Sequence, residues 1–595
     1  MKAIILAAGF GKRMRPLTDS IHKTMLMVGG RTVIQWIVDS LLENGISELV
    51  VVTGYRADEL KRYLSDAYPD LSIRYVHNAR YAETNNISSM ALALNSIDLD
   101  SDILLIECDL IFEPAVIAKL LRADGRNVAL VDHYRSGMDG TVVDVADGRI
   151  IDVIVPQRQG PGFVFAGKYK TLNIYRFSRD FCRGPFKKML DYYTAINENA
   201  YYEIVLGVII YLQQEAIHAE ILDVERWAEI DDPNDIAVAR YVFEPSSRSR
   251  ILNESHGGYW NYDVIDFCYL RNMYFPSGAI YSELRNSLPA LLQNYGSAQT
   301  LLDEKLAYYL LCEKENLVVL NGASQAFPAL AEHFADASVL LPAPVFGEYE
   351  RAFPKAFRFH DLGTVDLEQL PNVELTCLIN PNNPTGSVLS TKDIYAFAAA
   401  WPERTILCDE SFLEFSDESS IIGLLERQPI ENVIVIKSLS KTLGVPGLRL
   451  GYVYTANAAF RTRLRCRLPV WNINSIAEHF LEIILKHRGA IADSFAQTKQ
   501  DRKEFAEWLW TLDFVKQVWP SGGNFLLVEL NADQATASRW AEEILLRDGL
   551  RVKDISPRFP GNGAYWRVGV RLPQENWRLI QAMRRLTPAS MVARP

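Results

Sequence analysis

The sequence predicts an α/β protein made of two successive domains. From residue 1 to about residue 243, short apolar runs alternate with amphipathic stretches, and a second alternating series begins after residue 258. This alternation is typical of a mostly parallel sheet flanked by helices. The length agrees, because 595 residues exceed one hydrophobic core and fit roughly three to four packing units.

The N-terminal series gives the expected elements in order. The run KAIILAA (2–8) predicts a strand and VIQWIVDSLLENG (33–45) a helix. Further strands are expected at ELVVVTGY (48–55), DILLIECD (102–109) and NVALVDH (127–133). The stretch 244–258 is polar, lacks periodicity and carries turn residues, so we expect a linker there between domains 1–243 and 259–595.

In the C-terminal series, four apolar runs predict strands that lead into polar or turn residues. They are ENLVVLNGASQAF (315–327), VELTCLINPNNPTG (373–386), RTILCDESF (404–412) and NVIVIKSLSK (432–441). From about residue 469 the pattern is that of long helices. It ends in AYWRVGVRL (564–572), a strand expected in a smaller subdomain.

Composition and charge argue against several classes of function. The net charge of −11 argues against nucleic acid as a partner, because nucleic-acid-binding domains usually carry a basic footprint. The seven cysteines lack paired or metal-ligand spacing, which favours reduced thiols over disulfides or zinc. The opening apolar run is too short for a signal sequence or a membrane span, so we expect a cytoplasmic protein without membrane contact.

The first candidate site follows the first expected strand. That strand runs into Gly9 and Gly11, and the cations Lys12 and Arg13 come next. Glycine lets backbone NH groups approach a triphosphate closely, and the cations offset its charge. The spacing is neither the Walker form nor the dinucleotide form, since Met14 stands where a third glycine would be.

The full string LAAGFGKRMRPLT (6–18), with Lys23 five residues later, resembles the sugar-phosphate and choline-phosphate nucleotidyltransferases. The resemblance implies a Rossmann-like, GT-A-like mixed sheet in which Lys23 and Arg13 act on the reacting phosphates. The nucleotide contacts that it implies are Leu6, Ala7, Ala8, Gly9, Gly11, Lys12, Arg13 and Lys23.

Two carboxylate positions complete this site. Asp109 ends an expected strand, where a sheet's carboxyl edge faces a ligand, and EIDDPNDI (229–236) supplies Asp231. Magnesium takes one or two carboxylates plus substrate phosphate, so Asp109 and Asp231 are the expected Mg²⁺ ligands. The alternatives are a strand-end turn for Asp109 and a helix N-cap for Asp231 or Asp232, and a metal role for Asp232 or Glu229 stays open.

The segment YAETNNISSM (81–90) is similar to the choline-phosphate cytidylyltransferase branch. That similarity implies CTP and a small amino-phosphate acceptor, with Asn85, Asn86 and Ser89 near the base and acceptor. The alternative is an ordinary polar loop that caps the following helix.

The second candidate site centres on Lys441. This lysine lies in SLSK directly after an apolar strand, where Ser438, Ser440 and Arg449 can bind the phosphate of pyridoxal phosphate (PLP) while the lysine binds the cofactor itself. The other contacts expected from the residues are Asp409 for the pyridine nitrogen, Asn383 for the ring hydroxyl, Ala323, Ser324 and Gln325 for the phosphate, and Phe346 stacked on the ring. Core packing is the alternative for Phe346.

These segments together resemble the class I/II aminotransferases of fold type I, in the branch of histidinol-phosphate aminotransferase and threonine-phosphate decarboxylase, over about residues 253–588. The resemblance implies large and small subdomains and a homodimer in which Tyr295 reaches the neighbouring cofactor. It also implies Arg567 as the substrate-anion arginine, with Arg571 as a second contact. Phe412 departs from the family, where many members have a tyrosine that bonds the ring oxygen.

The two halves constrain one another. Transamination delivers a primary amine, which argues against a quaternary ammonium as the shared metabolite. The arrangement resembles phosphonate-tailoring cytidylyltransferases fused to an aminotransferase. This resemblance implies that phosphonoacetaldehyde and an amino-acid donor give 2-aminoethylphosphonate, which CTP then converts to its CMP derivative. The alternatives are a phosphoserine or phosphothreonine decarboxylase in the second half, making an amino-alcohol phosphate, and a PLP-sensing regulator.

Overall fold

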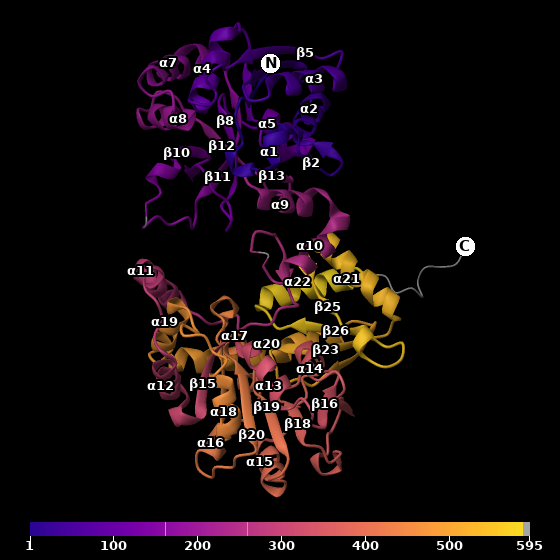
Figure 1. Cartoon of the computed structure of the whole chain (residues 1–595). Helices are drawn as coiled ribbons and strands as arrows, with labels where there is room; N and C mark the ends of the chain where they lie inside the picture. The colour runs from indigo at the N-terminus through magenta and orange to yellow at the C-terminus, as the bar shows by residue number, and fades with distance from the viewer. Residues whose placement is uncertain (161, 259, 587–595) are drawn as a thin grey trace, which may run out of the picture. The chain divides into compact units, whose positions relative to one another are not determined.

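The computed structural model describes residues 1–160, 162–258 and 260–586 (Figure 1). The chain forms two compact units, residues 1–263 and 264–595. Position 259 and the last nine residues of the expected second domain, 587–595, lie outside the described residues.

A nine-stranded mixed sheet forms the centre of the first unit. Its strand order is β5-β4-β1-β6-β11-β8-β12-β10-β9. β1 pairs in parallel with β4 and β6, whereas β11 runs antiparallel to β6 and β8. In sheet order the strands are Ser72–His77, Glu48–Thr53, Lys2–Ala7, Ile103–Glu107, Tyr169–Phe177, Val128–His133, His218–Ile221, Arg149–Ile154 and Val142–Ala146.

Both faces of this sheet are buried. Along β1, Ile4 and Leu6 pack into one core while Ala3 and Ile5 pack into the other, as the two-residue period of a strand requires. Figure 1 shows α4, α7 and α8 on one side of the sheet and α2, α3 and α5 on the other. These helices are Asn86–Ser96, Lys187–Ile196, Tyr202–Tyr211, Val33–Glu43, Ala57–Ala67 and Pro114–Arg122.

A short second sheet lies beyond the end of β6. β7 (Leu110–Phe112) pairs antiparallel with β13 (Trp227–Glu229), and Glu229 is opposite Leu110. Helix α9 (Pro233–Phe243) follows β13. This pairing brings the end of β6 next to residues 229–232, although more than a hundred residues separate them in the chain.

The expected linker is partly helical. Helix α10 (Arg248–Ser255) forms within it because Ile251 and Leu252 are buried, and it packs against α9 in the first unit. The boundary between the units falls at residues 263 and 264, a few residues beyond the expected linker.

A seven-stranded sheet forms the centre of the second unit. Its order is β15-β21-β20-β19-β18-β16-β17, and only β21 runs antiparallel to its neighbours. In that order the strands are Leu317–Asn321, Leu450–Thr455, Val433–Ser438, Thr405–Asp409, Leu375–Ile379, Val339–Ala343 and Phe357–His360. The surrounding helices include α11 (Gly278–Gln293), α12 (Gln299–Leu310), α13 (Phe327–His333), α14 (Gly347–Ala352), α15 (Thr391–Ala400), α17 (Leu439–Thr442), α18 (Ala458–Arg465) and α19 (Ser475–Ile484).

A smaller antiparallel sheet completes the second unit. Its order is β22-β23-β26-β25, formed by Val515–Trp519, Phe525–Leu530, Ala564–Gly569 and Lys553–Asp554. Helices α20 (Arg488–Trp510), α21 (Gln534–Asp548) and α22 (Pro573–Arg584) share one hydrophobic core with it. Within the described residues, no helix combines the length and the apolar character that a membrane span requires.

Candidate functional sites

The glycine turn of the first unit follows β1. Leu6, Ala7 and Ala8 are buried. A side chain at Gly9 would meet no atom within 4 Å, so the space beside this backbone is open. Gly11 has a φ of +61°, a left-handed conformation that glycine adopts without strain, and its carbonyl accepts a hydrogen bond of 2.9 Å from the Thr18 hydroxyl.

Lys23 bridges the two expected metal ligands. Its ammonium lies 2.9 Å from an oxygen of Asp109 and 2.8 Å from one of Asp231. Burial opposes the charge on Lys23, but the two carboxylates prevail and raise its pKa. Burial would likewise raise the pKa of Asp231, and the Lys23 and Arg13 cations instead bring that pKa below its usual value.

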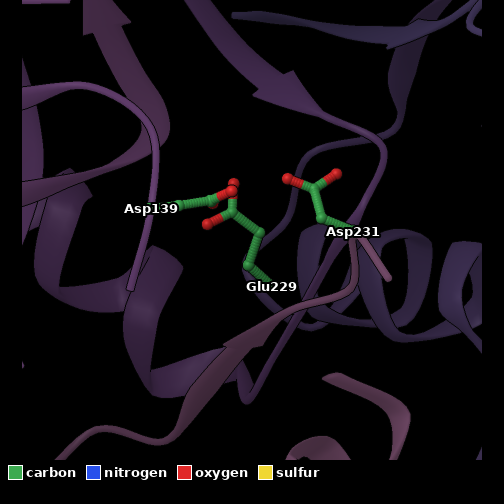
Figure 2. Close-up of side chains that lie close together, drawn as sticks. All are labelled: Asp139, Glu229 and Asp231. Atoms are coloured by element: carbon green, nitrogen blue, oxygen red, sulfur yellow. The ribbon is translucent and has the colours of Figure 1, made fainter. Parts of the chain in front are cut away.

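Further charged groups surround this pair. Arg13 contacts Asp231 at 2.7 Å and Asp139 at 2.9 Å. The carboxylates of Asp139, Glu229 and Asp231 point toward one another, with one oxygen of each within 4.8 Å of the others (Figure 2). The buried Lys170 pairs with Glu229 at 3.1 Å, and burial raises the pKa of Glu229 to about 7 despite that partner.

The neighbouring aspartates 231 and 232 have different roles. Asp232 is the N-cap of α9: its side chain accepts a hydrogen bond of 2.6 Å from the backbone NH of Asn234. Asp231 instead faces Lys23 and Arg13. The structure thus groups Asp231 with Asp109. Of the two neighbouring aspartates, it is Asp232 that has the helix-capping role considered above for either of them.

The side chains of the loop before α4 are engaged within the protein. Asn85 caps the helix by accepting from the Asn86 backbone NH at 2.9 Å. Asn86 donates to Glu107 and Glu203, and the buried Ser89 accepts from Asn78 at 3.2 Å. Burial raises the pKa of both glutamates. A contact of Asn85, Asn86 or Ser89 with a nucleotide therefore stays a prediction.

In the second unit, Lys441 lies in α17 immediately after β20. Burial, with the nearby guanidinium groups of Arg567 and Arg449, lowers the pKa of Lys441 to about 8. Among the described residues, no carboxylate forms a salt bridge with this ammonium. Lys441 is therefore far easier to deprotonate than an ordinary lysine.

The expected phosphate contacts gather beside Lys441. Arg449 donates to the Ser324 hydroxyl at 3.3 Å, and a side chain at Gly322 would overlap the Arg449 guanidinium. The Ser440 hydroxyl is buried and has no hydrogen-bond partner in the described part of the chain. The Ser438 backbone NH donates to Ser411 at 2.9 Å.

The other expected cofactor contacts of the second unit differ in how far they are engaged within the protein. The Gln325 side chain accepts from the Asn321 NH and donates to Asn472, each at 2.8 Å. Ala323 begins the 3-10 turn Ala323–Ala326 that precedes α13. Phe346 is 45% exposed where α14 begins, so its ring is available to a ligand.

Asp409 ends β19 and is held from two sides. The Tyr349 hydroxyl donates to one carboxylate oxygen at 2.8 Å, and the Ser411 backbone NH and hydroxyl donate to the other at 2.9 and 2.5 Å. Burial raises the pKa of Asp409, and these hydrogen bonds oppose that shift. Neither Tyr349 nor Ser411 was predicted from the sequence as a partner of Asp409. For Ser411, its position two residues after Asp409 was an available signal.

Arg567 and Arg571 have different surroundings. Arg567 donates to Asn383 at 2.7 Å and to the Cys268 carbonyl, and its Nε is buried without a partner among the described residues. Arg571 forms a two-pronged pair with Glu575, at 3.1 and 3.0 Å, and donates to the Asp266 carbonyl. Arg571 is thus engaged within the fold, so its expected substrate contact stays a prediction that this pairing disfavours.

Phe412 and Tyr295 also have defined environments. Phe412 is buried and packs edge-on against Phe525, with 5.2 Å between ring centroids. Tyr295 is 79% exposed and stacks on Trp471 at 4.4 Å.

Comparisons with known proteins agree with this two-part structure. Residues 3–161 match the MobA-like NTP transferase domain, and residues 283–579 match aminotransferase class I and II. The chain is 33% identical, over 98% of its length and 94% of the relative, to CMP-5'-(3-aminopropyl)phosphonate synthase of Streptomyces rubellomurinus. The chain belongs to this family of fused nucleotidyltransferase–aminotransferase enzymes.

Relatives of the second unit alone are also found. L-serine phosphate decarboxylase of Sulfurospirillum multivorans is 28% identical, over 54% of this chain and 87% of the relative. A histidinol-phosphate aminotransferase of Ruminiclostridium cellulolyticum is 29% identical, over 38% of this chain and 67% of the relative. The fused enzyme thus has an N-terminal NTP transferase domain and a C-terminal fold type I PLP aminotransferase domain, which confirms the predicted fold class.

The residues around Lys441 fit pyridoxal phosphate. The unpartnered Ser440 hydroxyl and the Arg449–Ser324 pair offer donors to a phosphate, and Asp409 is positioned by Tyr349 and Ser411. When bound, the cofactor supplies an aldehyde and an electron sink. Lys441, whose lowered pKa favours the neutral amine, is the residue that would hold that aldehyde, and its Nζ could carry a proton.

The residues around Lys23 fit a magnesium ion. Asp109 and Asp231 supply hard carboxylate oxygens, and one oxygen of Asp109 is buried without a hydrogen-bond partner among the described residues. The Lys23 ammonium lies between the two carboxylates and compensates part of their charge. Arg13 and Gly9 belong to the segment that follows β1, where the backbone at Gly9 is open and Arg13 contacts Asp231.

Proposed function

We propose that the second unit transfers an amino group from an amino acid to phosphonoacetaldehyde, giving 2-aminoethylphosphonate and a 2-oxo acid. The first unit then joins this product to CMP. A phosphonate oxygen attacks the α-phosphorus of CTP, the α–β phosphoanhydride bond breaks, and pyrophosphate leaves. Mg²⁺ held by Asp109 and Asp231, with Lys23 and Arg13, offsets the charge that develops on the phosphates.

The observation that carries the proposal is the group of cations around Arg567, the residue whose charge also acts on Lys441. Lys553 lies directly opposite Arg567 in the paired strands β25 and β26, and Arg551 and Arg558 add positive charge around them. Burial, and the mutual repulsion of these cations, lower the pKa of Lys553. Like charges opposite one another are unfavourable unless an anion lies between them, and a phosphonate dianion meets that requirement.

The first unit has the complementary charge. Asp139 and Glu229 add carboxylates beside Asp231, and such negative charge would stabilise the ammonium group of an acceptor. A molecule with an anionic phosphonate and a cationic amine two carbons away matches the cations of the second unit and the carboxylates of the first. The name of the Streptomyces relative, which contains 3-aminopropylphosphonate, supports this substrate class and makes the three-carbon amine the first alternative acceptor.

Phosphorus NMR on the purified chain tests the proposal. Incubation with phosphonoacetaldehyde, an amino-acid donor and PLP should give the 2-aminoethylphosphonate resonance, and addition of Mg–CTP should convert it to a CMP conjugate with release of pyrophosphate. If no aminophosphonate forms, the proposed transamination is wrong. If the amine forms but CTP stays intact with 2-aminoethyl-, 3-aminopropylphosphonate and phosphoethanolamine, the proposed cytidylylation is wrong.

The similarity to L-serine phosphate decarboxylase supports a second candidate for the second unit. In that case phosphoserine or phosphothreonine loses carbon dioxide and gives an amino-alcohol phosphate as the acceptor. Carbon dioxide release from phosphoserine, without an amino-acid donor, separates this reaction from transamination. A regulator that senses PLP without catalysis would show neither turnover.

We also propose a homodimer through the second unit. Tyr295, Trp471, Val470 and Leu292 are all more than half exposed, and the first two stack on one another. Exposed aromatic and aliphatic groups of this kind are typical of an interface between subunits. Such an interface agrees with the expected role of Tyr295 at a neighbouring cofactor.

A further inference from the structure

A hollow of about 220 Å³ lies beside the acidic cluster of the first unit. Asp139 and Glu229, which belong to that cluster, also line the hollow. Four aromatic side chains form much of the remaining wall: Trp227, Tyr241, Trp260 and Tyr262. A cavity with carboxylates at one end and aromatic rings around it is suited to an organic ammonium group.

Part of this wall comes from the segment 260–263, well after residue 161, where the match to the NTP transferase domain ends. The segment is attached to α9. The Tyr262 ring lies 5.0 Å from the Tyr241 ring, and the Tyr241 hydroxyl donates to the Asp263 carbonyl at 3.3 Å. Tyr241 is itself buried, so it holds the segment in place.

The loop 135–139 contacts the same segment from the other side. Arg135 lies 3.7 Å from Asp263, and a side chain at Gly137, whose φ is +91°, would overlap Asn261. Asp139 follows in this loop and pairs with Arg13. The segment, the loop and the charged cluster are therefore one connected structure.

We infer that residues 260–263 form one wall of the acceptor site, and that the rings of Trp260 and Tyr262 contact the amine end of an aminoalkylphosphonate. This inference rests on the proposed cytidylylation. With the phosphonate at the Lys23 site, an amine two carbons away extends toward Glu229 and Asp139 and then the aromatic wall. The C-terminal end of the first unit thus contributes to the substrate specificity of that unit.

Trp260 allows a clean test because its side chain is 74% exposed, so its removal does not open a core. The experiment uses the full chain with bound PLP and measures pyrophosphate release from Mg–CTP with supplied 2-aminoethylphosphonate. The variants are Trp260→Ala and Trp260→Phe. The matched control is Tyr211→Ala, which removes an 84% exposed aromatic side chain from the end of α8. Ethylphosphonate, which lacks the amine, serves as a competitive inhibitor.

We expect Trp260→Ala to raise the KM for 2-aminoethylphosphonate roughly 3- to 30-fold, the range of an aromatic–cation contact. The KM for CTP and the inhibition constant of ethylphosphonate should stay within about twofold, since neither depends on the amine contact. Trp260→Phe should restore much of the loss, and Tyr211→Ala should match the unsubstituted chain.

Three results would overturn the inference. The first is an unchanged KM for 2-aminoethylphosphonate in Trp260→Ala. The second is an equal weakening of ethylphosphonate or CTP, because the ring would then not act on the amine. In both cases the unsubstituted chain still turns over, so the proposed function stands. The third is no pyrophosphate release by the unsubstituted chain with any amino-organophosphorus acceptor, which removes the proposed cytidylylation and this inference together.

Discussion

At the scale of single residues, two lysines show how surroundings decide chemistry. Lys23 lies between two carboxylates, which raise its pKa and keep it charged, as the proposed contact with phosphates requires. Lys441 has guanidinium groups nearby, which with burial lower its pKa to about 8. The same side chain is thus kept charged in one unit and made easier to deprotonate in the other.

The lowered pKa of Lys441 predicts a pH dependence. Only the neutral amine reacts with an aldehyde, and Lys441 becomes neutral as the pH rises through about 8, well below the ordinary lysine value. The rate of PLP incorporation into the apoprotein should therefore rise with pH and level off above about 8. Stopped-flow absorbance of the cofactor gives this profile, and a midpoint near 10 would contradict the prediction.

Arg567 is the larger of the two cationic contributions to that shift. Arg567→Gln should move the midpoint of PLP incorporation to higher pH, because a positive charge that disfavours protonated Lys441 is gone. Arg567→Lys, which keeps the charge but not the planar fork, should leave the midpoint nearly unchanged while weakening substrate-anion binding. Equal midpoints for the Gln and Lys variants would show that the charge of Arg567 has no influence.

At the scale of elements, strand pairing and helix capping place the first site. The antiparallel pair β7 and β13 brings Asp109, two residues beyond the end of β6, next to the residues that precede α9, and the Ile230 NH donates to the Asp109 carbonyl at 2.8 Å. The start of α9 then separates two adjacent aspartates. Asp232 turns back to cap the helix, and Asp231 points to the cluster.

This division predicts different effects of two neighbouring substitutions. Asp231→Asn should reduce pyrophosphate release by about 100-fold or more, because it weakens the charge contacts to Lys23, Arg13 and the proposed metal. Asp232→Ala should lower the free energy of unfolding by about 1 kcal/mol through loss of the cap, with pyrophosphate release largely retained. Urea denaturation and steady-state kinetics distinguish the two. The reverse pattern would assign the metal contact to Asp232.

At the scale of the whole molecule, each unit holds a separate set of candidate reactive groups. Lys23, Asp109 and Asp231 lie in the first unit, and Lys441, Asp409 and Arg567 lie in the second. Each set lies within its own unit, in agreement with the proposal that each unit carries one reaction.

Separate substitutions should therefore separate the activities. Lys441→Ala should abolish amine formation and leave pyrophosphate release with supplied amine intact, because no described contact of the first site involves Lys441. Asp109→Asn should do the reverse. Both reactions are followed by phosphorus NMR in the same preparations. Loss of both activities from one substitution, in a protein with unchanged circular dichroism, would refute independent sites.

The proposed homodimer predicts a mass of twice 67.3 kDa in light scattering. Val470→Asp places a charge in the exposed apolar group beside Trp471 and should shift the mass toward the monomer, because the charge would have to be buried in the interface. Tyr211→Asp, a charge on an exposed position of the first unit, should leave the dimer intact. A monomeric unsubstituted chain would contradict the proposal.

The sequence by itself determined what depends on neighbouring residues. The two-residue alternation along β1, the glycine turn after it and the lysine directly after β20 are local features, and they predicted the α/β class and the two kinds of domain. Only the tertiary structure decided which charges meet. Lys23 pairs with residues 86 and 208 positions away, and Asp139 and Lys170 join that cluster from other elements. Such pairings depend on strand order and register, and the energy of a charge depends on all its neighbours in space, which no local pattern contains.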